Sequence, residues 1–239
     1  MTGNPQTAIR LEGVVVRFAQ KQLSFNCTIA PGEIVAVTGP SGAGKSTLFN
    51  TIAGFEVVDD GRIEIFDEDV TGEDPAKRPI SLIFQHNNLF AHLDVATNIG
   101  LGIHPALRLS ARDKNRISEA LVRVGLGSFE KRLPSTLSGG EQQRVAFARA
   151  LVRNRPILLL DEPFAALDPG LRSEMSALLL DLHCETGSTI LLVTHQPEDV
   201  IKLADSAIFI DKGHIVAHEK TERFLSRTDI PELAAFLGR

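Results

Sequence analysis

The sequence predicts an α/β fold with a mainly parallel core sheet, an antiparallel β subdomain and an inserted helical subdomain. Three observations predict it: strand-like patterns fill the first 30 residues, a helical pattern covers 91–153, and short apolar strands alternate with helices afterwards. With 239 residues the chain fits one domain, 1–239. We expect its core at about 1–85 and 154–239, and the helical subdomain at about 86–153.

Apolar periodicity and turn residues place the individual elements. Residues 10–18 and 23–29 read as strands and precede a Pro31-Gly32 turn, whereas the continuous β-branched run 34–38 is typical of a strand buried on both faces. Residues 61–66 alternate like an edge strand, and 81–84 resembles a buried one. The remaining expected elements are a helix over 47–53, strands over 157–160, 189–194, 206–210 and 214–217, and a short polar helical tail.

Composition limits the class of protein. Hydrophobic residues make up 43% of the chain and charged residues 23%, which is typical of a globular protein. The net charge of -5 argues against a nucleic-acid partner, because phosphate backbones need a basic face. Cys27 and Cys184 lack the spacing of a zinc site. The N-terminus lacks a signal-like apolar stretch, and no run reaches the roughly 18 apolar residues of a membrane span. We expect a soluble chain that acts at a membrane only through partners.

A phosphate-binding loop is predicted between the strand 34–38 and the following helix. The pattern G-x-x-x-x-G-K-[ST] is formed by Gly39, Pro40, Ser41, Gly42, Ala43, Gly44, Lys45, Ser46 and Thr47. Glycines let backbone N–H groups converge on phosphate oxygens at a helix N-terminus. Lys45 would reach the β and γ phosphates of a nucleotide, and Ser46 would bind Mg²⁺. A plain glycine-rich turn is the alternative, and the pattern arises by chance in roughly 1% of chains this long.

Two carboxylates follow the apolar strand 157–160. Asp161 and Glu162 lie where that strand ends, and ligands bind at the carboxyl ends of parallel strands. Asp161 would hold Mg²⁺ directly or through water, and Glu162 would act as general base on an attacking water. The alternative is a pair of solvated acids in a loop.

A second candidate phosphate site begins at Ser138. The spacing of Ser138 and Glu141 is that of a capping box, and it predicts a helix start. With Gly139 and Gly140 this start leaves bare N–H groups that would bind the γ-phosphate of a nucleotide. The run Leu-Ser-Gly-Gly-Glu-Gln-Gln-Arg over 137–144 resembles the signature of the ATP-binding-cassette (ABC) ATPases.

This resemblance implies the P-loop NTPase fold of an ABC cassette and assigns further residues. Gln85 matches the glutamine that senses Mg²⁺ and the attacking water, and His195 matches the switch histidine that contacts the γ-phosphate. Asp168 matches the aspartate that contacts the opposite protomer, although Ala165 stands where family members usually carry serine. Phe18 matches the aromatic that stacks on adenine, with a core phenylalanine as the alternative.

The resemblance also implies an activity and partners. The chain would bind and hydrolyse ATP with Mg²⁺ as a homodimer, in which the signature segment of one protomer covers the nucleotide held by the other. Its further partners would be an integral membrane permease and, indirectly, a periplasmic solute-binding protein, with no nucleic acid. It would lie peripherally on the cytoplasmic face of the bacterial inner (plasma) membrane.

Three segments narrow the resemblance. Residues 84–93, 98–102 and 161–169 are similar to those of the ATP-binding subunits of bacterial thiamine importers. Cassettes of putrescine, iron and sulfate importers are also similar and remain alternatives. A soluble ABC protein of translation or DNA repair would normally carry two cassettes or a long coiled coil, and an unrelated P-loop kinase would lack the signature.

Overall fold

The computed structural model describes residues 6–19, 21–84 and 88–238. Its strands form one mixed sheet in the order β5-β4-β1-β2-β10-β9-β3-β8-β7-β6. The strands are β1 (Ile9–Phe18), β2 (Lys21–Ile29), β3 (Ile34–Thr38), β4 (Asp60–Ile65), β5 (Glu68–Asp69), β6 (Ile80–Ile83), β7 (Ile157–Asp161), β8 (Thr189–Val193), β9 (Ser206–Asp211) and β10 (His214–Lys220).

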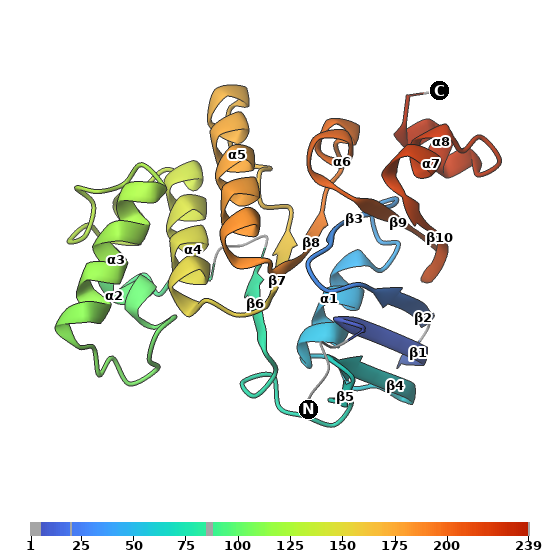
Figure 1. The fold of residues 1–239 in the computed structure, drawn as a ribbon, viewed down its shortest axis with the longest axis horizontal. Helices are drawn as coiled ribbons and strands as arrows, with labels where there is room; N and C mark the ends of the chain where they lie inside the picture. The colour runs from blue at the N-terminus through green and yellow to red at the C-terminus, as the bar shows by residue number, and fades with distance from the viewer. Residues whose placement is uncertain (1–5, 20, 85–87, 239) are drawn as a thin grey trace.

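The helices cover both faces of the sheet and extend from one end of it (Figure 1). They are α1 (Lys45–Ala53), α2 (Val95–Gly100), α3 (Ala111–Arg123), α4 (Gly139–Arg153), α5 (Pro169–Thr186), α6 (Pro197–Leu203), α7 (Thr221–Ser226) and α8 (Pro231–Phe236), with a 3-10 turn at Pro134–Thr136. None of the helices in the described part of the chain has the length and apolar character needed to cross a membrane.

The parallel part of the sheet comprises β9, β3, β8, β7 and β6. Every residue of β3, β7 and β8 is buried, as the continuous apolar runs predict. Successive side chains of β7 enter different cores, because a strand alternates its faces. Ile157 and Leu159 pack with α1, whereas Leu158 and Leu160 pack with α4 and α5.

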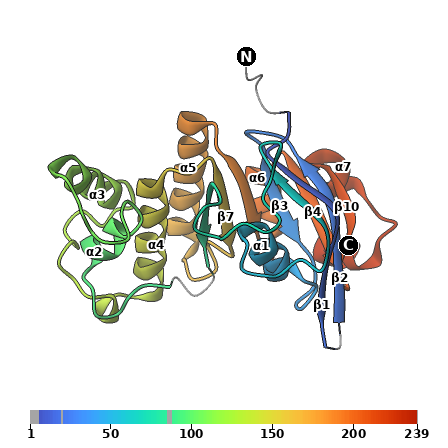
Figure 2. The ribbon, with the colours of Figure 1, turned by 90° about the horizontal axis from the view of Figure 1, so that it is seen from below.

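The antiparallel strands are continuous with this parallel sheet. β1 pairs with β2 and β4, β4 pairs with β5, and β10 pairs with β9. A single parallel residue pair, His214 with Ser24, joins β10 to β2. The sheet curls around α1, so that Leu48, Phe49 and Ile52 pack against antiparallel and parallel strands alike (Figure 2). The fold class predicted from the sequence is therefore confirmed.

One element prediction needs correction. The strand expected at an edge over 61–66 is β4, and β5 pairs beyond it. The strand expected to be buried over 81–84 is β6, and it is buried although it is the last strand of the sheet. Ile80 packs in the core that contains α1, and Ile83 packs in the core that contains α4. Local periodicity reports burial of a side chain but does not report whether another strand pairs alongside.

The helices α2, α3 and α4 lie together at one end of the molecule, opposite α7 and α8 (Figures 1 and 2). Their contacts with one another place them in one group, and their apolar side chains merge with those of α5 and the parallel strands in one continuous core. The division of the chain into a core at about 1–85 and 154–239 and a helical subdomain at about 86–153 stays a prediction.

Candidate functional site

The predicted phosphate loop connects β3 to α1 and has a backbone that requires glycine. Gly39, Gly42 and Gly44 have φ values of 142°, 73° and 115°, outside the range that other residues readily adopt. A Cβ at Gly39 would lie 2.1 Å from the backbone oxygen of Ile210 in β9. The loop is therefore fixed close to the sheet, and its helix N-terminus is positioned for an anion.

Lys45 closes over this loop. Its Nζ donates hydrogen bonds to the carbonyl oxygens of Gly39, at 2.8 Å, and Pro40, at 2.9 Å. The residue is only 7% exposed. Burial lowers the pKa of Lys45, and the nearby carboxylates of Glu162 and Asp161 oppose this effect. The ammonium group thus lies between the loop and the two acids.

The two predicted metal ligands in the described part of the chain meet. Ser46, in the first turn of α1, lies near the carboxylate of Asp161 at the end of β7. Burial raises the pKa of Asp161, while the nearby Ser46 hydroxyl opposes that shift. A cation would offset the same desolvation cost, so a hydroxyl and a buried carboxylate are a suitable donor pair for Mg²⁺. Gln85, the third predicted ligand, lies outside the described residues.

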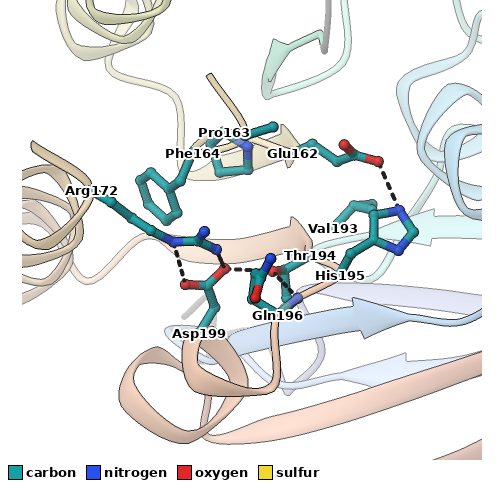
Figure 3. A pocket seen from close by; sticks show the side chains of 10 residues that line it. Glu162, Pro163, Phe164, Arg172, Val193, Thr194, His195, Gln196 and Asp199 are labelled. Carbon is teal, nitrogen blue, oxygen red and sulfur yellow. Dashed lines mark hydrogen bonds and ion pairs between the residues drawn. The ribbon is translucent and has the colours of Figure 1, made fainter. Parts of the chain in front are cut away.

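The two predicted catalytic residues at the strand ends also meet. Glu162 follows β7 and His195 follows β8, which are neighbouring parallel strands. Nε2 of His195 lies 2.9 Å from Oε1 of Glu162 (Figure 3). Glu162 has a left-handed backbone, with φ at 51°, and its N–H donates to the carbonyl oxygen of Val193 at 3.2 Å. This turn directs the acid side chain toward the histidine rather than along the strand.

The helix start at Ser138 has the predicted capping box. Ser138 Oγ accepts from the N–H of Glu141 at 3.3 Å, and Glu141 Oε2 accepts from the N–H of Ser138 at 2.7 Å. This backbone hydrogen bond lowers the pKa of Glu141. Within the described residues, no hydrogen bond joins 138–141 to the phosphate loop of the same chain.

The structure places Phe18 and Asp168 separately from these pairs. Phe18 ends β1 with 45% of its surface exposed, so its ring is available for stacking. Beside it, Lys21 Nζ donates to the carbonyl oxygen of Gly42 at 2.6 Å. Asp168 caps α5, where its Oδ1 accepts from the N–H of Leu171 at 3.0 Å.

A polar network beside the site was not predicted. Arg172 of α5 donates to both carboxylate oxygens of Asp199 in α6, and the Thr194 hydroxyl donates to Asp199 as well. The Gln196 N–H in turn donates to the Thr194 hydroxyl at 3.1 Å. Together with Glu162 and His195 these residues line a cavity between the ends of β7 and β8 (Figure 3). The spacing of residues in the sequence does not predict this network, because its side chains come from α5, from α6 and from the segment that follows β8.

Comparison with known proteins adds to this geometry. Residues 22–165, more than half of the chain, match the model of the family described as ABC transporter. The chain belongs to the ABC transporter family. The thiamine import ATP-binding protein ThiQ of Rhizobium meliloti (strain 1021) is 60% identical to it over 97% of this chain and 98% of the relative. The protein of the same description from Photobacterium profundum is 47% identical over 90% of each chain.

Solved structures of cassettes show the same fold. A nucleotide-free ATP-binding cassette from an ABC transporter superposes with a TM-score of 0.84 at 25% identity, covering 96% of this chain and 98% of the other. The dimeric post-hydrolysis state of the cassette MJ0796 bound to ADP and Pi gives a TM-score of 0.81 at 31% identity. That match covers 89% of this chain and 98% of MJ0796. The chain is therefore an ABC cassette, a nucleotide-binding protein.

Proposed function

We propose that this chain is the ATP-binding and ATP-hydrolysing subunit of a membrane importer for thiamine and its phosphates. Thiamine is proposed as the solute because the chain is 60% identical, along nearly its whole length, to a protein described as a thiamine import ATP-binding protein. The hydrolytic role is supported by the arrangement of Glu162 and His195 beside Lys45 and Asp161. Hydrolysis of ATP would drive the transport that a partner in the membrane carries out.

The phosphate loop and its neighbours would hold the nucleotide. The N–H groups of 39–47 would bind the phosphates, Lys45 would exchange its carbonyl partners for β- and γ-phosphate oxygens, and Phe18 would stack on adenine. Ser46 and Asp161, with Gln85, would hold Mg²⁺. When bound, Mg²⁺ neutralises charge on the phosphates during transfer.

Glu162 and His195 would act on the water and the γ-phosphate. The Glu162 carboxylate, turned away from the strand, would accept a proton from the attacking water. His195 would orient that carboxylate through the 2.9 Å hydrogen bond and contact the γ-phosphate. The polar network of Arg172, Asp199 and Thr194 would hold the segment that carries His195.

A second copy of the chain would complete each site. The start of α4 makes no hydrogen bond to the phosphate loop of its own chain in the described residues, yet it is a capped helix start suited to a phosphate. It consists of Ser138, Gly139, Gly140 and Glu141. In a two-fold homodimer this segment would cover the partner's nucleotide, and Asp168 would contact the opposite protomer. The dimeric cassette MJ0796 is a precedent for such assembly.

The importer would need further subunits. An integral membrane permease would carry the solute and hold this chain peripherally on the cytoplasmic face of the bacterial inner membrane. A periplasmic solute-binding protein would deliver thiamine to the permease and act on this chain only indirectly. Residues 84–93 and 98–102, where the sequence is most like that of thiamine importers, would receive the permease.

The base assignment is tested with Glu162→Gln. The amide keeps the shape of the side chain but cannot accept the proton, so we expect turnover to fall by about 10²-fold to 10³-fold while ATP binding persists. ATP would then trap a dimer, which size-exclusion chromatography with light scattering detects. The exposed Glu174→Gln in α5 is the matched control and should hydrolyse normally. Near-normal hydrolysis by Glu162→Gln would refute the assignment.

The solute is tested by uptake in cells that cannot make thiamine. Deletion of this chain should raise the external thiamine that such cells need, and the parent chain should restore uptake of labelled thiamine. Glu162→Gln, expressed at the same level, should not restore it because transport depends on hydrolysis. Uptake that is unchanged by the deletion would remove thiamine as the solute.

A further inference from the structure

Gln143 links the helix that begins at the signature segment to the backbone of Glu162. It lies one turn into α4 and is only 6% exposed. Its Nε2 donates to the carbonyl oxygen of Glu162 at 3.1 Å, across 19 positions of sequence. Its Oε1 is buried and has no hydrogen-bond partner in the described part of the chain. Buried polar atoms normally have hydrogen-bond partners, so a buried amide whose oxygen has none needs an explanation. We take the hydrogen bond to Glu162 as that explanation.

The Glu162 peptide needs such support. Its φ of 51° lies in the left-handed region, which costs free energy for a residue with a Cβ and persists only where the surroundings fix it. Two backbone bonds help to fix it: the N–H of Glu162 donates to Val193, and its carbonyl oxygen accepts from the N–H of Ala165 at 3.2 Å. Gln143 supplies a further contact, which among the hydrogen bonds of this peptide in the described residues comes from outside the two strand ends.

The start of α4 also packs against the loop that follows Glu162. A Cβ on Gly140 would lie 3.1 Å from Leu167 Cδ2 and 3.5 Å from the carbonyl oxygen of Ala166. This close approach keeps α4 against the segment between β7 and α5. The neighbouring Gln142 behaves differently, because its Nε2 donates to Pro134 and Leu137, both just before the same helix.

We propose that Gln143 is a positioning residue, which orients the Glu162 peptide from the signature helix and thereby aims the general base. The proposal rests on the proposed function, in which Glu162 is the base. It has one consequence for the dimer. The start of α4 would cover the partner's nucleotide while the next turn holds the base of its own site, so one rigid helix would connect the two reaction sites.

Gln143→Met tests the proposal. Methionine has nearly the same length but no donor, and the Glu162 oxygen keeps its bond from Ala165, so the substitution should leave the fold intact. We expect kcat for ATP hydrolysis to fall about tenfold, because a small displacement of a base weakens catalysis. The KM for ATP should stay within about twofold, because no hydrogen bond joins Gln143 to the phosphate loop in the described part of the chain. Gln6→Met, at an exposed side chain outside the signature segment, is the matched control, with kcat within about twofold of the parent.

Gln143→Glu adds a readout that a merely structural role would not change. Its ionised carboxylate would repel the Glu162 carbonyl oxygen, whereas the protonated acid would donate to it as the amide does. Turnover relative to the parent chain should therefore rise as the pH is lowered from about 8 to about 6. The same ratio for Gln143→Met should stay constant over that range.

The outcomes separate this proposal from the proposed function. Positioning by Gln143 is overturned if kcat of Gln143→Met equals that of the parent or of Gln6→Met, or if the Gln143→Glu ratio does not respond to pH. If Glu162→Gln itself hydrolyses ATP normally, the base assignment fails instead. Dimer trapping by Glu162→Gln with and without Gln143→Met should be equal, since the proposal concerns aim and not assembly.

Discussion

Two adjacent acids reach different environments because the backbone turns between them. Asp161 ends β7 in a regular strand conformation, is buried, and meets Ser46 of the phosphate loop. Glu162 adopts a left-handed conformation and meets His195. One carboxylate therefore faces the predicted metal position and the other the predicted water position. The sequence shows two acids in a row, but the change in φ decides their separate roles.

Substitution by alanine should lower the free energy of unfolding by different amounts at Gly39 and at Gly42. Both have positive φ, so alanine is strained at each by about 1–2 kcal/mol. Gly42→Ala meets no atom within 4 Å and should cost only that strain. Gly39→Ala would meet a backbone oxygen of β9 and should cost more than about 4 kcal/mol, or prevent folding. Urea unfolding followed by circular dichroism measures both, and equal losses would contradict the assigned close approach.

At the scale of elements, helices α5 and α6 hold the loops at the ends of β7 and β8. Arg172 of α5 pairs with Asp199 of α6, and Asp199 also accepts from Thr194 just before His195. Asp199 is buried, so its charge needs these donors. The network joins the helix that Asp168 caps to the segment that carries His195. Movement of one helix would therefore reach the proposed catalytic pair, Glu162 and His195.

Removal of Arg172 alone should destabilise the protein more than removal of the charges of both Arg172 and Asp199. Arg172→Leu leaves the Asp199 carboxylate buried without its counter-ion and should cost about 3 kcal/mol. Adding Asp199→Asn removes the uncompensated charge and keeps an acceptor for Thr194, so the double variant should be more stable than Arg172→Leu alone. Chemical denaturation of the parent, single and double variants gives the comparison. A double variant no more stable than Arg172→Leu would exclude a buried-charge cost.

At the scale of the whole molecule, α1 unites the two kinds of strand. Among the residues that the structure describes, one residue pair joins β2 to β10 within the sheet. The same core nevertheless contains side chains of β1, β2 and β4, of α1, and of β3, β7 and β8. The predicted phosphate loop enters α1 directly, so the helix that follows this loop is also the centre of the core. Burial of its apolar side chains holds the curled sheet around the site.

Phe49 of α1 tests whether this core is one cooperative unit. Phe49 is buried, and Phe49→Ala should lower the free energy of unfolding by about 3–5 kcal/mol. Unfolding should remain a single transition by circular dichroism and by calorimetry, because one core supports both parts of the sheet. Val57→Ala is the control, with the side chain 81% exposed and an expected change within about 0.5 kcal/mol. Two separate transitions would show that the antiparallel strands fold independently.

The predictions from sequence succeeded where the signal was local. The run 34–38 and the strands at 157, 189 and 206 appear within about one residue of their expected bounds, because each is a short apolar run buried on both faces. The capping box of Ser138 and Glu141 forms as the spacing predicts. The edge assignment of 61–66 was wrong, because pairing with β5 depends on a turn that periodicity does not report. The roles of the site residues stay predictions.

The sequence by itself determined the α/β class, the phosphate loop, the signature segment and the paired acids, because each depends on residues close together in the chain. Only the tertiary structure decided that Glu162 meets His195, that Gln143 holds the Glu162 peptide, and that Arg172 neutralises Asp199. These partners are 33, 19 and 27 positions apart. They meet because strand order brings β7 beside β8 and packs α4, α5 and α6 around their ends, and no local spacing encodes that order.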